Sequence, residues 1–303
     1  MDHPKITDYL ITALAPIIWG STYLVTTELL PSNSPLLASV IRALPAGLIL
    51  LLIGRTLPTG IWWCRALVLG VLNIGAFFYF LFVAAYHLPG GIAALVMSFQ
   101  PMLVLLLGLI VLKAPIHTNQ LLACIIGAAG IAMLVLQSTI KLNMTGVLAG
   151  LAATLCMATG IVLSKHWGRP QGVSLLTLTG WQLTVGGLVL LPIALLTESL
   201  PTEITLLNGI GFSYLSLFGA LVAYAIWFRG IERLPAATVS FISFGSPLTA
   251  CILGFVFLNQ SLSLMQSIGA IIIIIAIWLS QPKNKREPQS SLPKLDTPLS
   301  KMT

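Results

Sequence analysis

The chain consists mainly of apolar stretches that are long enough to cross a lipid bilayer and that contain almost no charged residues. An α-helix rises about 1.5 Å per residue, so about 20 apolar residues span a hydrocarbon core of about 30 Å. Ten stretches meet this length, at residues 10–30, 36–54, 66–86, 91–112, 118–137, 144–164, 174–196, 207–228, 236–257 and 263–280. We therefore expect an all-α membrane protein with ten transmembrane helices, which leaves no room for a soluble catalytic domain.

Charged residues make up only 8% of the chain, and their distribution indicates how the helices are oriented. Lys and Arg gather on the cytoplasmic side of membrane proteins. If the N-terminus is cytoplasmic, 13 of the 15 Lys and Arg residues lie on that side, whereas Lys141 faces outward and Arg42 lies inside a span. The sequence thus predicts a multi-pass protein of the bacterial inner membrane with both termini in the cytoplasm. The net charge of +7 reflects this topology and does not indicate nucleic acid as a partner.

The two halves of the chain resemble each other at a nearly constant offset, which indicates an internal repeat. Pro89 recurs 146 residues later as Pro235, each after a Leu, and Pro101 recurs as Pro247 at the same offset. Each half contains five spans, so the second half enters the membrane from the opposite face, as in the inverted repeats of secondary transporters. Chance likeness between apolar segments is the alternative, and the shared Pro offsets argue against it.

The repeat and the change in composition near residue 281 divide the chain into three parts. We expect a first five-helix repeat at residues 1–138, a second and inverted five-helix repeat at residues 139–281, and a disordered basic cytoplasmic tail at residues 282–303. The tail is polar and rich in Pro, a composition that cannot bury enough apolar surface to fold.

Several short motifs occur in a fixed order along the two halves. Each half has a Leu-Pro turn before its fourth span and a Pro inside that span, and Trp19-Gly20-Ser21, Arg42 and Trp181-Gln182 lie in other spans. Together these motifs resemble two EamA modules of the drug/metabolite transporter superfamily, over about residues 5–280. The resemblance implies a ten-helix bundle that moves small metabolites, often amino acids or related compounds and often outward. It also implies a central cavity lined by the first, third, fourth, sixth, eighth and ninth spans.

Polar and aromatic residues inside the spans are the candidates for binding a substrate. Pro101 and Pro247 each remove a backbone donor within a span, so we expect them to act as gating hinges. Aromatic rings with a polar atom prefer a cavity or a packed interior to lipid. The candidate substrate-binding residues are Trp19, Tyr23, Tyr79, Ser98, Gln100, Trp181, Tyr224, Trp227, Ser243 and Ser246. The alternatives are ordinary kinks with packing serines and, for Trp227, an anchor at the membrane interface.

Arg42 is the only ionised side chain well inside a span. Burial of such a charge in a membrane costs about 2.5–3.5 kcal/mol, so we expect it to pair or to face water. Glu28, near the outer end of the first span, is the candidate partner. One interpretation is an ion pair that fixes the first span to the second, and the other is attraction of a substrate carboxylate. The amides of Asn73, Gln100 and Gln182 are also costly in lipid, so we expect them in the interior.

The chemistry of these residues favours transport over catalysis. The four His residues lie at span ends or in loops, and the four Cys residues lack metal-type spacing. We therefore expect no catalytic residues, no metal and no cofactor. No Asp or Glu lies at the middle of a span, so a cationic drug fits poorly and a neutral or zwitterionic metabolite fits better.

We therefore expect a secondary transporter that exports small neutral or zwitterionic metabolites, such as amino acids or related compounds, across the inner membrane by alternating access. Its partners are expected to be the lipid bilayer and a small-molecule substrate, and we expect a monomer or a weak homodimer. The alternatives are an efflux protein for drugs or toxic compounds and, less favoured, a channel-like facilitator.

Overall fold

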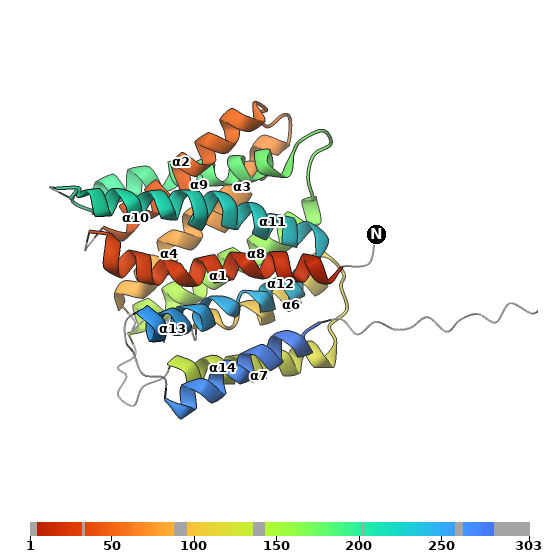
Figure 1. Ribbon diagram of the computed structural model, residues 1–303. Helices are drawn as coiled ribbons and strands as arrows, with labels where there is room; N and C mark the ends of the chain where they lie inside the picture. The colour runs from red at the N-terminus through yellow and green to blue at the C-terminus, as the bar shows by residue number, and fades with distance from the viewer. Residues whose placement is uncertain are drawn as a thin grey trace, which may run out of the picture.

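In the computed structural model the protein is a bundle of helices that run side by side (Figure 1). The structure describes residues 5–31, 34–87, 96–135, 143–201, 203–257 and 263–281. Within these ranges every regular element is a helix. The Leu88-Pro89 turn, the first residues of the predicted fourth span and the basic tail at 282–303 lie outside the described residues.

The helix bounds overlap the predicted spans. The first half of the chain contains α1 (Ile6–Leu29), α2 (Pro35–Gly54), α3 (Trp62–Gly70), the π-helix η1 (Val71–Gly75), α4 (Ala76–His87), α6 (Gln100–Val111) and α7 (Thr118–Val135). The second half contains α8 (Met144–Trp167), α9 (Leu175–Thr197), α10 (Leu206–Ser216), the π-helix η2 (Leu217–Val222), α11 (Ala223–Arg233), α12 (Ala236–Ile242), α13 (Gly245–Phe257) and α14 (Leu264–Leu279).

The helices have the length and surface of membrane-spanning segments. Seven stretches of the described residues are long and apolar enough to cross a membrane, at Ile6–Thr26, Pro35–Gly54, Trp62–Ala84, Met144–Trp167, Leu175–Thr197, Leu206–Arg233 and Ala236–Phe257. Shorter apolar helices lie at Gln100–Val111, Thr118–Met133 and Leu264–Leu279. Large apolar side chains point outward, and Leu52 and Ile110 are each 74% exposed, as contact with lipid requires. The prediction of an all-α membrane protein is therefore confirmed.

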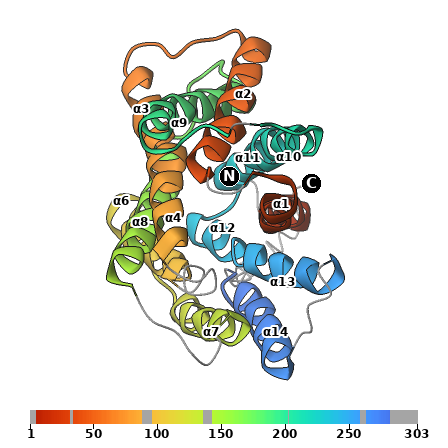
Figure 2. The same cartoon turned by 90° about the vertical axis from the view of Figure 1, so that its left-hand side faces the viewer.

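Two helix pairs lie at opposite sides of the bundle when it is viewed along the helices (Figure 2). α2 packs on α9 at the top of this view, and α7 packs on α14 at the bottom. Gly47 allows the close approach of α2 to α9, because a Cβ at this position would overlap the backbone nitrogen of Thr184. Between the two pairs, α4 and α6 contact α8, and α11 and α13 contact α1.

Two of the long helical segments are interrupted by π-helical turns at equivalent places in the two halves. η1 separates α3 from α4, and η2 separates α10 from α11. Their first residues, Val71 and Leu217, are 146 residues apart, the offset that also separates Pro101 from Pro247. A π-helical turn takes up an extra residue, is frequent at functional sites and breaks the regular pattern of backbone hydrogen bonds. The sequence analysis did not predict these turns, because they leave the apolar character of a span unchanged.

Candidate functional site

The backbone carbonyl of Gly219, in η2, is a central polar contact inside the bundle. Trp19 Nε1 donates a hydrogen bond to this oxygen at 3.0 Å, and Arg42 Nη2 donates another at 2.8 Å. The donors come from α1 and α2, so one carbonyl joins three helical segments. A carbonyl oxygen has two lone pairs and can accept both bonds. In a membrane fold such polar backbone groups must be satisfied from within the protein.

Aromatic rings surround this contact. The Trp19 ring lies 5.1 Å from the Tyr224 ring and 5.1 Å from the Trp227 ring. The guanidinium carbon of Arg42 lies 5.1 Å from the centre of the Phe78 ring, which lies 6.4 Å from the Tyr224 ring. The structure therefore brings together four of the predicted site residues. We name the central cluster by its members Trp19, Arg42, Phe78, Gly219, Tyr224 and Trp227.

Two buried polar atoms in or beside the central cluster have no partner among the described residues. Trp227 is 1% exposed and Ser216 is 6% exposed, yet Trp227 Nε1 and Ser216 Oγ make no hydrogen bond within the described part of the chain. Ser216 lies three residues before Gly219 in the sequence. An unsatisfied buried donor costs about 1–3 kcal/mol. A polar ligand would satisfy these atoms, which makes the central cluster a candidate binding site.

The structure does not support the predicted pairing of Arg42 with Glu28. Glu28 is exposed, and the ion pairs of the described residues do not include it. Arg42 contacts the carbonyl of Gly219 and the ring of Phe78 instead. The physical reason is that a backbone carbonyl in η2 lies within reach inside the bundle, whereas Glu28 stays at the water-exposed end of α1.

Other predicted aromatic residues do not join the central cluster. Trp181 is buried against Ala66 and Leu178, and its Nε1 donates to Thr56 O at 2.8 Å, so it fixes α9 to the loop after α2. Tyr79 is half-buried on α4 and packs against Phe80 with ring centres 5.4 Å apart. Tyr23 lies on α1, but its side chain is outside the described part of the structure.

The two predicted hinge prolines lie close to interruptions of their helices. One interruption contains Ser98 and directly precedes α6, whose second residue is Pro101. The other contains Ser243 and separates α12 from α13, whose third residue is Pro247. Ser246 N donates to Ser243 O at 3.0 Å, a bond over three residues instead of four. The prolines therefore accompany bends, and their role as gates stays a prediction.

A second buried polar group lies at η1. Asn73 Nδ2 donates to Gln182 Oε1 at 2.8 Å and to Ser164 Oγ at 3.2 Å. We call Asn73, Ser164 and Gln182 the amide cluster. Asn73, Gln182 and Gln100 are 1%, 0% and 5% exposed, which confirms that these amides lie in the interior. Asn73 precedes Gly219 by 146 residues, so the two clusters occupy equivalent places in the two halves.

An ion pair joins α1 and α11 at one end of the bundle. Asp8, only 5% exposed, accepts a hydrogen bond from Arg229 Nη2 at 2.6 Å and lies 3.7 Å from Arg233 Nη1. Thr12 packs one turn further along α1, where a Cβ on Gly230 would overlap its side chain. The two helices are therefore in close contact at this end, which we call the basic end after Arg229, Arg233, Lys165 and Arg169.

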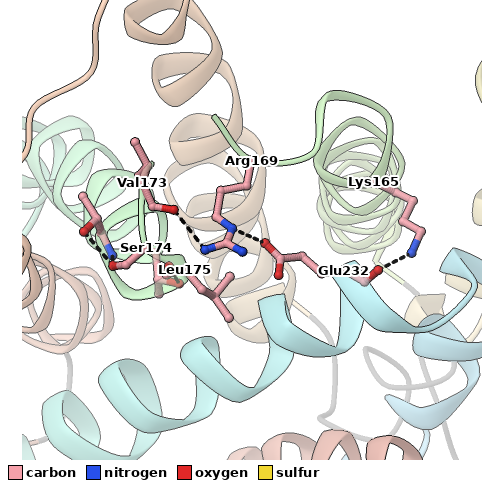
Figure 3. Close-up of polar contacts among 8 residues, drawn as sticks. Lys165, Arg169, Val173, Ser174, Leu175 and Glu232 are labelled. Atoms are coloured by element: carbon pink, nitrogen blue, oxygen red, sulfur yellow. Dashed lines mark hydrogen bonds and ion pairs between the residues drawn. The ribbon is translucent and has the colours of Figure 1, made fainter. Parts of the chain in front are cut away.

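Charged residues also join α8 to α11 at the basic end (Figure 3). Glu232 Oε1 lies 3.0 Å from Arg169 Nε, and Lys165 Nζ donates to the backbone oxygen of Glu232 at 2.7 Å. A pocket of about 640 Å³ opens here between the end of α8, the loop at residues 168–174 and Glu232. The sequence analysis overlooked Asp8 and Glu232. The sequence feature that could have identified them is that each is an acidic residue among the Lys and Arg of the predicted cytoplasmic side.

The described residues provide no group of three or more His, Cys, Asp or Glu side chains that could hold a metal ion. The polar groups in and around the central cluster and the amide cluster are instead amides, hydroxyls, indole nitrogens and the guanidinium of Arg42. Such groups bind an organic molecule through hydrogen bonds and ring contacts.

Comparisons with known proteins match most of the chain. The model of the EamA-like transporter family matches it twice, at residues 7–136 and 144–280. Protein PecM of Dickeya dadantii (strain 3937) is 50% identical over 267 residues, which are 88% of this chain and 90% of that protein. The inner membrane transporter YedA of Escherichia coli (strain K12) is 28% identical over 271 residues, 87% of each chain. A solved crystal structure with 18% identity shares the fold, with a TM-score of 0.78 over 90% of this chain and 97% of that chain.

Proposed function

Because the chain belongs to the EamA-like transporter family, we propose that it is a secondary transporter for small neutral or zwitterionic metabolites, such as amino acids or related compounds. It exports them across the bacterial inner membrane by alternating access. The observation that carries this proposal is the central cluster, which places a guanidinium, aromatic rings and polar atoms without a partner in the described part of the chain inside a membrane fold. Membership in the family confirms the resemblance found in the sequence and identifies the chain as a transporter, not an enzyme.

The helix contacts support ten spans in two inverted repeats. If each half is exchanged for the other, the contact of α4 with α8 becomes that of α11 with α1. In the same way, the contact of α6 with α8 becomes that of α13 with α1, while the pairs α2 with α9 and α7 with α14 map onto themselves. The two family matches, one in each half, and the equivalent π-helical turns also support this arrangement.

In this proposal the basic end faces the cytoplasm, together with both termini. Arg229, Arg233, Lys165 and Arg169 lie there, and positive charge gathers on the cytoplasmic side of membrane proteins. Glu198 lies at the other end of α9, where its carboxylate accepts hydrogen bonds from Leu36 N and Leu37 N at 2.7 and 2.8 Å. We infer a monomer or a weak homodimer as the functional unit.

The chemistry of the central cluster supports a zwitterionic substrate with a carboxylate, or a neutral molecule with polar groups. The guanidinium of Arg42 binds a carboxylate with directed hydrogen bonds, and the rings of Trp19 and Tyr224 accept an apolar or ammonium group on their faces. The residues of the cluster include no carboxylate, which disfavours a purely cationic drug. A drug or toxic-compound efflux protein is the second candidate, because aromatic rings also bind flat apolar molecules.

Counterflow in proteoliposomes tests the proposed function. The vesicles are loaded with the twenty protein amino acids, and uptake of the same mixture in labelled form is measured. We expect uptake well above that of protein-free vesicles, and we expect Arg42→Gln to lower it at least about tenfold because a charge-assisted bond is lost. Arg55→Gln, at an exposed Arg outside the cluster, is the matched control. Ion current without counterflow would indicate a channel, and flux of cationic dyes alone would favour drug efflux.

A further inference from the structure

We propose that the pocket at the basic end is a second binding site, which takes a small zwitterion with a carboxylate from the cytoplasm before this ligand reaches the central cluster. The substrate class rests on the proposed function. The location rests on the pocket, on its charges and on the amide cluster behind it.

The pocket offers both signs of charge, with a surplus of positive charge. Lys165, Arg169 and Glu232 line it, and Glu232 pairs with Arg169 at 3.0 Å. Lys165 Nζ donates to the backbone oxygen of Glu232, so the positive charges of Lys165 and Arg169 share the one carboxylate of Glu232 (Figure 3). A ligand carboxylate is therefore attracted to Lys165 and Arg169. The Glu232 side chain is 30% exposed and can accept a hydrogen bond from the ligand's ammonium group.

The inner wall of the pocket leads to buried polar atoms that need partners. Ser164 lines the pocket, and its Oγ accepts a hydrogen bond from Asn73 Nδ2 at 3.2 Å. Asn73 Oδ1 and Gln182 Nε2 have no partner within the described part of the chain, although these residues are 1% and 0% exposed. If oxygen and nitrogen are exchanged in both amides, the same two positions still hold one acceptor and one donor without a partner, with the two roles exchanged. A polar path therefore runs from the pocket towards the interior of the bundle.

The position of the amide cluster in the repeat supports a binding role. Asn73 in η1 and Gly219 in η2 are 146 residues apart, and each is held by a polar side chain from the neighbouring helix of the other half. In an inverted repeat, equivalent sites lie towards opposite faces of the membrane. The amide cluster lies next to the pocket of the basic end, which makes it the counterpart of the central cluster on the cytoplasmic side.

Binding in the pocket has a consequence for the contact between α8 and α11. Arg169 and Glu232 hold each other in the empty pocket, and a zwitterion offers a new partner to both. The ligand therefore competes with the ion pair and loosens one tie between these helices. Binding of the substrate at this site would therefore release the ion pair of Arg169 with Glu232 at the basic end, which has to open during transport.

Protection of an introduced cysteine tests this proposal. Ser164→Cys is made in a protein whose four native cysteines are replaced by Ala, and a membrane-impermeant maleimide is added to inside-out vesicles. We expect labelling from the cytoplasmic face, and we expect the mixture of twenty amino acids to slow it. The double variant Lys165→Gln and Arg169→Gln should raise the half-protecting concentration, which is the amino-acid concentration that halves the labelling rate, about tenfold or more. The reason is that charge-assisted bonds are lost. Arg55→Gln is the matched control and should leave this concentration unchanged.

Three results would overturn the proposal: no labelling from the cytoplasmic face, labelling that the amino acids do not slow, or equal protection by inorganic phosphate, which would indicate a simple anion site. Gln171→Cys, at another residue of the pocket lining, provides the same measurement if Ser164→Cys does not insert. Counterflow without protection would mean that this inference fails alone. Protection without counterflow would mean that the proposed function fails while the pocket still binds.

Discussion

At the scale of single residues, the central cluster depends on the indole nitrogen of Trp19, which donates to the carbonyl of Gly219 at 3.0 Å. Trp19→Phe removes this donor and keeps a ring. Such a bond contributes about 0.5–1.5 kcal/mol, so we expect counterflow to fall about two- to tenfold at unchanged insertion. The rate is measured in proteoliposomes with equal amounts of protein. Trp63→Phe, at an indole that is 56% exposed, is the control, and equal rates for Trp19→Phe and the wild type would contradict this role.

The sequence predicted the interior location of these residues better than it predicted their partners. Trp19, Tyr224 and Trp227 are among the aromatic residues predicted for a cavity or a packed interior, and Tyr224 and Trp227 are each 1% exposed. The partner of Arg42 was not predicted, because a backbone carbonyl leaves no trace in the amino-acid sequence. The partner of Trp181 was not predictable for the same reason, since its indole donates to the carbonyl of Thr56.

At the scale of helices, the pairing of α2 with α9 depends on the missing side chain of Gly47. Gly47→Ala places a Cβ where the backbone of Thr184 lies, and such overpacking costs about 1–3 kcal/mol. We expect a clearly lower midpoint of thermal unfolding in detergent. The midpoint is measured by size-exclusion chromatography of the protein that remains folded after heating to each temperature. Gly108→Ala is the matched control, because a Cβ there meets no atom within 4 Å and Ala favours a helix by about 1 kcal/mol. A lower midpoint for both variants would show that the contact is not the cause.

Helix positions were predictable because hydropathy reports directly on burial in lipid. The segment expected at 66–86 is present in the structure as α3, η1 and α4, with bounds from Trp62 to His87. Its interruption by η1 was not predictable from apolar character. Asn73 in η1 donates to Gln182 on α9, and such a contact between helices is not visible in the hydropathy of a single span.

At the scale of the whole molecule, the proposed inverted repeat predicts that both ends of the chain lie on the same face of the membrane. With five spans in each half, we expect a fluorescent protein fused after Gln281 to fold and fluoresce in the cytoplasm. Alkaline phosphatase inserted between Glu198 and Glu203 should be active, because the proposed topology places that loop on the periplasmic face. Fluorescence and enzyme activity in whole cells measure both expectations. An active phosphatase fused after Gln281 would mean either that the orientation is reversed or that the number of spans is odd.

The proposed alternating access requires the basic end to open, and we expect the ion pair of Asp8 with Arg229 to oppose this opening. Asp8→Asn removes the charge that both Arg229 and Arg233 face. Loss of a partner from a largely buried ion pair costs several kcal/mol, so the open state should gain at least about 1.4 kcal/mol, or about tenfold in population. Thr12, which is 0% exposed and packs against Gly230, reports on this change as Thr12→Cys in the cysteine-free protein.

We therefore expect Asp8→Asn to raise the rate of Thr12→Cys labelling by a cytoplasmic maleimide about tenfold, in proportion to the population of the open state. Glu203→Gln removes an exposed carboxylate from the opposite end of the bundle and should leave the rate unchanged. An increase in both variants would indicate a general loss of stability. An unchanged rate in Asp8→Asn would mean that the packing of α1 against α11, and not the ion pair, keeps the basic end closed, since Thr12 and Gly230 remain in contact when the charge is removed.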